Sequence, residues 1–114
     1  MVEDEPLVAL LLEMMLEDAD LTARVVTTPY EALDLLMSGE VVNVLVTDIN
    51  LETDMDGLQL ARVARTERPD LKVLYVSGDS GHRWEAEGVP GSRLLPKPFS
   101  RDQFHDAVRL TLAV

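Results

Sequence analysis

Acidic, hydroxyl and ammonium side chains stand at the ends of the strand-like segments of this sequence. They are Glu3, Asp4, Glu5, Asp48, Ser77 and Lys97. Carboxylate oxygens are hard ligands of the kind that hold Mg²⁺, cations neutralise a phosphoryl group during its transfer, and a carboxylate can itself be the nucleophile. Together, these residue types permit metal-assisted phosphoryl chemistry.

Each of these residues also has a simpler interpretation when it is taken alone. An Asp at a strand end is commonly a turn residue or a helix cap, and Lys97 could be an ordinary surface lysine. Ser77 could bond to nearby backbone, and the acidic residues 3–5 could favour a following helix through its dipole. Their shared position at strand ends is what favours a common site.

Strand-like and helix-like segments alternate along the chain. The strand-like segments after the first are residues 22–27, 41–47, 71–76 and 92–95. The helix-like segments are residues 6–17, 28–38, 56–68, 80–88 and 100–113. Such alternation favours a parallel sheet with helices on both faces, because each parallel strand pair needs a crossover connection. Ligands bind at the carboxyl ends of the strands in such sheets, so we expect the polar residues to converge there.

Three polar residues have the position of helix N-caps. Thr28 with Glu31, and Ser100 with Gln103, have the spacing of capping boxes, and Asp56 can cap the helix between them. These residues predict where three of the five helices begin.

Length and composition limit the classes of protein that remain. The 114 residues fit one domain, residues 1–114, and the 46% hydrophobic content suits a folded globule. The net charge of −11 disfavours direct binding to nucleic acid or to a membrane surface. The chain has no cysteine and no basic-then-apolar leader, and no apolar run is long enough to span a bilayer, so we expect a cytoplasmic protein.

Five motifs in order along the chain resemble those of a known family. They are VEDEPLV (residues 2–8), LVTDINL (45–51), MDGLQLA (55–61), LYVSGD (74–79) and LLPKPF (94–99). In this combination the chain resembles the receiver domain of bacterial two-component response regulators, of the stand-alone or hybrid-kinase type. The resemblance implies a flavodoxin-like, doubly wound α/β fold: a five-stranded parallel sheet in the order 2-1-3-4-5, with five helices.

The resemblance also implies a role for each residue of the cluster. Asp48 would accept a phosphoryl group from a phosphohistidine. Lys97 would pair with a phosphoryl oxygen, Ser77 would turn its hydroxyl toward the phosphate, and Pro98 would follow a cis peptide bond. The residues implied for the metal, Mg²⁺, are Glu3 through a water molecule, Asp4, Asp48, and Asn50 through its backbone carbonyl.

The partners that the resemblance implies are proteins. A histidine kinase or a histidine phosphotransfer protein would supply the phosphoryl group, a downstream protein would receive the signal, and a second copy of the chain is a further candidate. We expect no direct nucleic-acid or membrane partner. The domain would be a signalling phosphoacceptor that assists its own phosphotransfer and dephosphorylation, not an enzyme.

Two features depart from the family pattern. Only Met1 and Val2 precede the first acidic cluster, so we expect a shortened first strand and a domain of marginal stability. Leu94 stands where many members carry an aromatic switch residue, so we expect the readout of phosphorylation to use movement of residues 80–91 instead.

Other functions stay open as alternatives. The main one is a phosphorylation-independent protein-interaction module with the same fold, which the intact set of acidic residues, Ser77 and Lys97 disfavours. A magnesium-dependent phosphatase of the haloacid dehalogenase type would need a second Asp two residues after the nucleophile, where this chain has Asn50. A flavin-binding protein would need a Ser- or Thr-rich phosphate loop after the first strand, which the sequence lacks.

Overall fold

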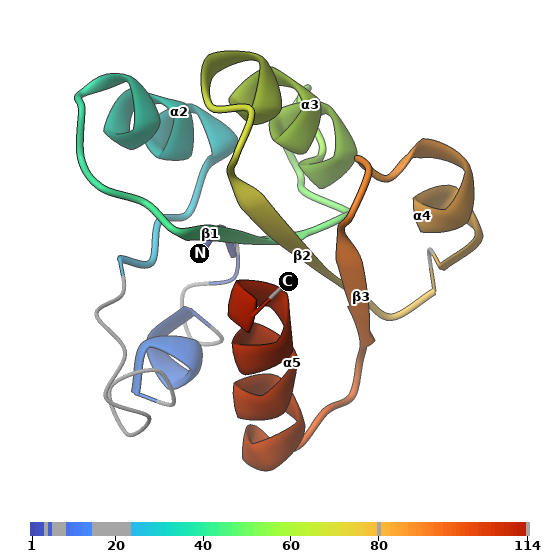
Figure 1. The fold of residues 1–114 in the computed structure, drawn as a ribbon. Helices are drawn as coiled ribbons and strands as arrows, with labels where there is room; N and C mark the ends of the chain where they lie inside the picture. The colour runs from blue at the N-terminus through green and yellow to red at the C-terminus, as the bar shows by residue number, and fades with distance from the viewer. Residues whose placement is uncertain (4, 6–8, 15–23, 80, 114) are drawn as a thin grey trace.

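A parallel sheet forms the centre of the molecule (Figure 1). The computed structural model describes residues 1–3, 5, 9–14, 24–79 and 81–113. Its strands are β1 (Val44–Asp48), β2 (Lys72–Ser77) and β3 (Arg93–Pro96), in the order β1-β2-β3. Its helices are α2 (Pro29–Met37), α3 (Gly57–Glu67), α4 (Gly81–Glu87) and α5 (Arg101–Ala113), and residues 9–14 are also helical.

The first two predicted strands are represented by single pairings instead of ladders. Within the described residues, three segments form strands, and Val2 makes isolated parallel bridges to Val26 on one side and to Thr47 on the other. Val2 therefore lies between the segment around Val26 and β1. Residues 22 and 23 of the predicted second strand lie outside the described residues, so the five-stranded sheet is not established as such.

The third predicted strand begins later than the sequence suggested. Residues 41–47 were expected to be extended and buried, but β1 starts at Val44, and Val41 is 88% exposed. The first residue of β2, Lys72, pairs with Val44, so the residues before Val44 have no strand beside them. Without a neighbouring strand, β-branched residues alone do not make a buried strand.

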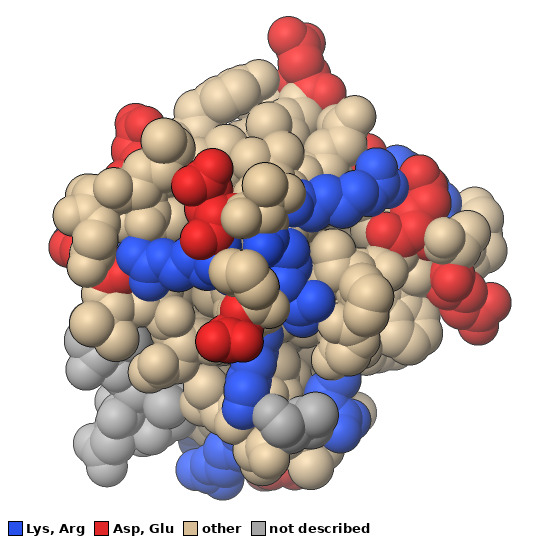
Figure 2. Space-filling model, turned by 45° about the horizontal axis from the view of Figure 1, so that its top comes forward, with Lys and Arg blue, Asp and Glu red and all other residues tan. Residues whose placement is uncertain are grey.

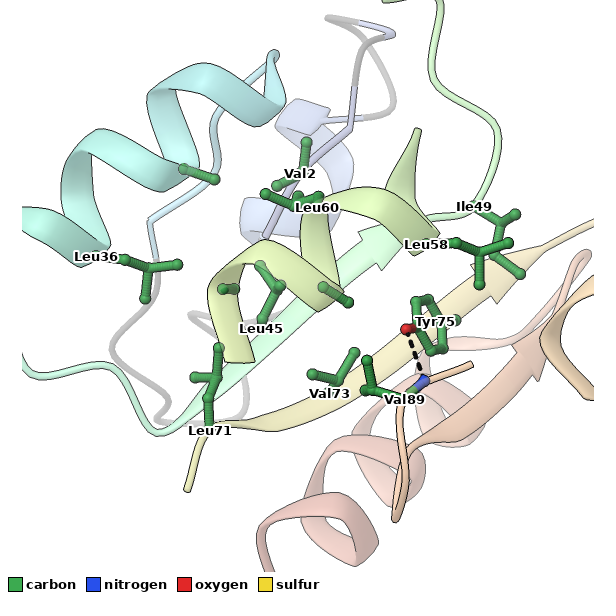
Figure 3. Close-up of a cluster of buried hydrophobic side chains, with 13 residues drawn as sticks. Val2, Leu36, Leu45, Ile49, Leu58, Leu60, Leu71, Val73, Tyr75 and Val89 are labelled. Atoms are coloured by element: carbon green, nitrogen blue, oxygen red, sulfur yellow. Dashed lines mark hydrogen bonds between the residues drawn. The ribbon is translucent and has the colours of Figure 1, made fainter. Parts of the chain in front are cut away.

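Successive residues of the strands serve the two faces of the sheet. In β2, Val73 and Tyr75 belong to a buried cluster with side chains of α2 and α3, which is drawn in Figure 3. Leu74 and Val76 belong to a second cluster, with Phe104 of α5. Figure 1 shows α2 and α3 on one side of the sheet and α5 on the other, which confirms the predicted two-faced arrangement.

The helix starts follow the predicted caps. The Thr28 hydroxyl accepts the Glu31 N–H at 3.2 Å, and the Ser100 hydroxyl accepts the Gln103 N–H at 3.1 Å. At α3, the Asp56 carboxylate accepts the Gln59 N–H at 2.9 Å, while the Gln59 side chain accepts the Asp56 N–H at 3.0 Å. Such reciprocal bonds satisfy backbone donors that a helix end leaves unpaired.

The helix that includes residues 9–14 buries one side and exposes apolar side chains on the other. Ala9 and Leu12 are buried, whereas Leu10, Leu11 and Met14 are each more than half exposed. In the described part of the chain, none of the helices is both long and apolar enough to cross a membrane.

Phe104 gives a direct test of the second cluster. Its side chain is fully buried and stacks on Phe99, with ring centroids 5.5 Å apart. We expect Phe104→Ala to lower the free energy of unfolding by about 3–5 kcal/mol, measured by urea denaturation. Leu110→Ala on the same helix removes a side chain that is 52% exposed, and its cost should stay below about 1 kcal/mol. Equal losses in the two variants would contradict the assigned core.

Candidate functional site

Three of the predicted site residues meet at the carboxyl edge of the sheet because of the strand register. Asp48 of β1 pairs with Val76, the residue before Ser77, and Ser77 in turn pairs with Pro96, the residue before Lys97. The backbone N–H of Lys97 donates to the Ser77 carbonyl at 2.8 Å. The predicted convergence of Asp48, Ser77 and Lys97 is therefore confirmed, whereas their chemical roles stay predictions.

An ammonium group joins two carboxylates at this edge. Lys97 Nζ donates to Asp48 Oδ2 at 2.7 Å and lies 3.5 Å from Glu3 Oε1. Glu3 reaches this position because the Val2–Thr47 bridge sets it beside Asp48. The two carboxylates and one ammonium leave this group of three side chains with a net negative charge, which suits a further cation.

Glu3, Asp48 and Lys97 differ in how much of each side chain is exposed, and this decides which of them a reactant can reach. The Glu3 side chain is 3% exposed, the Asp48 side chain 14% and the Lys97 side chain 34%. A buried carboxylate is costly unless it is paired, so Glu3 depends on its neighbours for charge balance. Asp48 keeps a small opening to solvent, through which a reactant can reach its carboxylate.

The surroundings of Lys97 keep it protonated. Burial alone would lower the pKa of the Lys97 ammonium, but the hydrogen bond and charge of Asp48, with the charge of Glu3, outweigh that effect and raise the pKa above 10.5. A permanent positive charge at this position can neutralise an anionic oxygen near Asp48. The Lys97–Pro98 peptide bond is cis, as the family resemblance implied.

The other predicted site residues are placed less completely. Ser77 is buried at the end of β2, and Asn50 follows β1 by two residues. Asp4, a predicted metal ligand, lies outside the described residues. Among the residues that the structure describes, no group of three or more His, Asp or Glu side chains is arranged to hold a metal ion. Glu3 and Asp48 nevertheless contribute the hard carboxylate oxygens that Mg²⁺ prefers.

Gly57 lets the loop after β1 pass close to the Asp48 backbone. Its N–H donates to the Ile49 carbonyl at 2.8 Å, and a Cβ at this position would lie 2.0 Å from the Asp48 carbonyl oxygen. Any side chain here would therefore displace the backbone that carries the Asp48 carboxylate. This is the physical requirement for glycine in the MDGLQLA motif.

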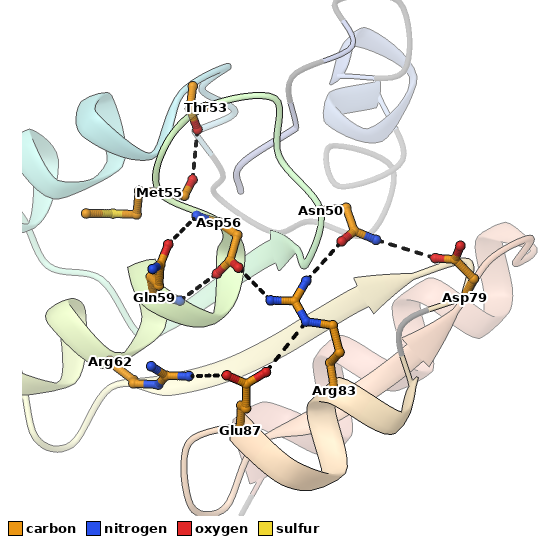
Figure 4. Close-up of polar contacts among 9 residues, drawn as sticks. All are labelled: Asn50, Thr53, Met55, Asp56, Gln59, Arg62, Asp79, Arg83 and Glu87. Carbon is orange, nitrogen blue, oxygen red and sulfur yellow. Dashed lines mark hydrogen bonds and ion pairs between the residues drawn. The ribbon is translucent and has the colours of Figure 1, made fainter.

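A polar network beside the site was not anticipated from the sequence (Figure 4). Arg83 of α4 donates to Asp56 Oδ2 at 2.7 Å and to Asn50 Oδ1 at 3.2 Å. Asn50 Nδ2 donates to Asp79 Oδ1 at 3.4 Å. Asp56 and Asn50 are 27 and 33 residues away from Arg83 in the chain, so no local spacing could have indicated these two contacts.

Charges of both signs lie together on the surface. On the face shown in Figure 2, Lys and Arg side chains lie among Asp and Glu side chains. Arg62 and Glu87, for example, approach to 3.2 Å. Mixed charges and a net charge of −11 do not suit binding to a phosphate backbone.

Comparisons with known proteins agree with one another. Residues 1–109 match the family model described as the response regulator receiver domain. The chain is 32% identical over 114 residues to the sensor kinase CckA of Brucella abortus (strain 2308), an alignment that covers 96% of the chain. The matched region is 12% of the length of CckA.

Solved structures give the same result for the fold. A response regulator receiver protein from Sinorhizobium medicae WSM419 is 36% identical with a TM-score of 0.92, covering 99% of this chain and 91% of that one. The response regulator TrrA from Thermotoga maritima, solved in complex with Mg(2+)-BeF, has a TM-score of 0.81 over 97% of this chain and 95% of its own, and at 22% identity shows the fold alone. A flavodoxin-like fold with a parallel sheet and five helices is thereby confirmed.

The close approach at Gly57 predicts a severe effect of one methyl group. We expect Gly57→Ala to lower the free energy of unfolding by at least about 2 kcal/mol, measured by urea denaturation, because the Cβ overlaps the Asp48 carbonyl. The control is Gly78→Ala, since a Cβ there would meet nothing within 4 Å. A cost at Gly57 no larger than at Gly78 would show that the backbone beside Asp48 yields easily.

The cap of α3 predicts a specific loss of stability in acid. Burial raises the pKa of Asp56, but the bond from the Gln59 N–H and the charge of Arg83 outweigh it and hold the pKa below 3.8. The stabilisation is therefore complete above the unfolded-state pKa and is lost as the pH falls through the lower folded-state pKa. Between pH 7 and pH 3, wild type should lose more unfolding free energy than Asp56→Asn, which keeps a capping side chain without the charge. Parallel losses in the two proteins would refute the assignment.

Proposed function

Because the chain belongs to the response regulator receiver domain family, we propose that Asp48 accepts a phosphoryl group from a phosphohistidine and thereby switches the binding of a partner. The observation that carries this proposal is the Lys97 ammonium, 2.7 Å from Asp48 Oδ2, at the sheet edge where Ser77 also ends its strand. A histidine kinase or a histidine phosphotransfer protein is the donor in this scheme.

The proposed step exchanges one bond to phosphorus for another. A carboxylate oxygen of Asp48 attacks the phosphorus, the phosphorus–nitrogen bond to the histidine breaks, and its electron pair returns to the imidazole. The transition state spreads negative charge over the phosphoryl oxygens, so catalysis is mainly positioning and charge stabilisation. Lys97 supplies that charge from within the domain, and the Ser77 hydroxyl is the proposed donor to the bound phosphate. The domain in this way assists its own modification and its reversal.

Mg²⁺ is the proposed cofactor. The residues that would hold it are Glu3, Asp4, Asp48 and the Asn50 carbonyl, and the described carboxylates among them carry the net negative charge that such an ion would balance. When bound, the ion supplies additional neutralisation of the transferring oxygens. The complex of TrrA with Mg(2+)-BeF supports this assignment at the level of a shared fold.

Several finer features belong to the same proposal. The sheet would have five strands in the order 2-1-3-4-5, which the two bridges of Val2 support. The domain would act in the cytoplasm. The matches to a sensor kinase and to a receiver protein support both hybrid-kinase and stand-alone settings. Leu94 is half-buried and packs against the first cluster, so the readout would use α4 and its flanking loops instead of a rotating ring.

Intact mass spectrometry tests the proposal. After incubation with acetyl phosphate and Mg²⁺, we expect wild type to gain the mass of one phosphoryl group, and Asp48→Asn to gain nothing. Omitting Mg²⁺ should abolish the gain, and Lys97→Ala should slow it by a factor of about 100 because the neutralising cation is lost.

Two results would count against the proposal. A folded wild-type protein that gains no phosphoryl mass under any condition would favour the alternative, an interaction module that works without phosphorylation. A mass gain that persists in Asp48→Asn would place the acceptor on another residue.

A further inference from the structure

An open hollow lies between α2 and α3, the two helices that pack side by side on one face of the sheet (Figure 1). Its volume is about 510 Å³, a size typical of sites that take up an organic group. The residues that line it are Tyr30, Asp54, Met55, Gln59, Arg62 and Val63. This lining shares no residue with the cluster of Asp48, Ser77 and Lys97, so the hollow is a separate surface.

Apolar side chains from both helices line this hollow. Tyr30 of α2 is 47% exposed and Val63 of α3 is 40% exposed. Met55, in the loop before α3, is half-buried and packs against the buried cluster drawn in Figure 3. The hollow therefore connects exposed apolar surface with the core, as a docking site for an apolar side chain does.

The exposed apolar surface continues along α2. Met37 is 68% exposed and follows Tyr30 by seven residues, so both side chains lie on the same side of the helix. This distance is about two helical turns, or about 10 Å. A groove between two helices, with apolar side chains over such a length, suits the apolar face of a third helix.

The charges around the hollow favour a positively charged partner. Asp54 lines it, Asp34 is exposed on α2, and α2 contains two acidic residues and no basic one. Arg62 also lines the hollow, but its guanidinium lies 3.2 Å from the Glu87 carboxylate, which offsets its charge (Figure 4). A partner that brings Lys or Arg side chains is therefore attracted, whereas an anionic partner is repelled.

We propose that the hollow between α2 and α3 binds a basic, amphipathic helix of another protein. An apolar side chain of that helix enters between Tyr30 and Val63, and its Lys or Arg side chains lie beside Asp34 and Asp54. A second copy of this chain is a poorer occupant, because a net charge of −11 makes two copies repel each other. The inference goes beyond the proposed phosphorylation of Asp48 and does not rest on it.

An NMR titration with two synthetic peptides tests this surface. The basic peptide is about four helical turns long, with Leu on one side and Lys on the other, and the acidic peptide has Glu in place of every Lys. We expect the basic peptide to shift the backbone amide signals of α2 and of residues 54–63, and the acidic peptide to leave them unchanged. Shifts confined to residues 9–14, where other apolar side chains are exposed, would overturn the proposal.

Substitutions in the hollow test the apolar contact. We expect Tyr30→Ala to raise the Kd of the basic peptide about tenfold, because a tyrosine at the centre of an interface commonly contributes that much. Val63→Lys, which places a cation in the hollow, should raise the Kd by a similar factor. Leu110→Ala removes a comparably exposed apolar side chain from α5 and should leave the Kd unchanged. Thermal unfolding of each variant checks that folded proteins are compared.

Two matched double variants test the charges. Asp34→Asn combined with Asp54→Asn should raise the Kd about fivefold and weaken its dependence on salt, because two exposed ion pairs with the peptide are lost. Asp102→Asn combined with Asp106→Asn removes two exposed charges from α5 instead. At about 0.15 M ionic strength these distant charges are screened, so the Kd should change by less than about twofold.

Three results would contradict the proposal. Equal effects of the two double variants, or equal binding of the two peptides, would mean that the hollow does not select its partner. Unchanged binding by Tyr30→Ala would place the peptide elsewhere. A wild-type dimer that Tyr30→Ala abolishes, measured by analytical ultracentrifugation, would make a second copy the occupant. The phosphoryl mass gain on Asp48 is measured separately, so its failure and the failure of this docking surface are distinguishable.

Discussion

Parallel pairing of β2 with a strand on each side is the constraint on which the site depends. All three strands run in the same direction, so their last residues lie at one edge of the sheet. The register then places Asp48, Ser77 and Lys97 close together at that edge. A shift of one residue in either pairing would turn these side chains to the other face. The two buried clusters stabilise this register, because alternate residues of β2 pack into clusters on opposite faces of the sheet.

Electrostatics at that edge follows from the same arrangement. Lys97 is shared between two carboxylates that the sheet brings together from distant parts of the chain. The pairing lowers the cost of burying Glu3, yet it leaves the three charges short of neutral. An edge of this kind attracts a cation, which is what the phosphoacceptor role proposed above requires.

Local signals in the sequence predicted the features that local chemistry determines. The caps at Thr28, Asp56 and Ser100 lie where the spacing of polar residues placed them, since a capping box involves residues three apart. The identity of the site came from the combination of motifs around Asp48 and Lys97. Alternation of segments was sufficient to predict a two-faced parallel sheet.

Features that depend on distant partners were missed or misplaced. β1 begins only where Lys72 of β2 stands beside it, so the apolar residues before Val44 were wrongly included. The contacts of Arg83 join segments about thirty residues apart, and an arginine in a short polar helix is ordinary in sequence. Such contacts form only in the tertiary fold, so no short-range sequence pattern predicts them.

α4 has no fully buried side chain, in contrast to α3 and α5. It is attached through ion pairs and the half-buried Trp84, whose indole N–H donates to Ser92 at 3.0 Å. Segments with so little burial open locally at a small fraction of the global free energy. A protein that captures α4 in an altered position would break the bonds from Arg83 to Asn50 and Asp56 at that small cost, without opening the cores that α3 and α5 complete.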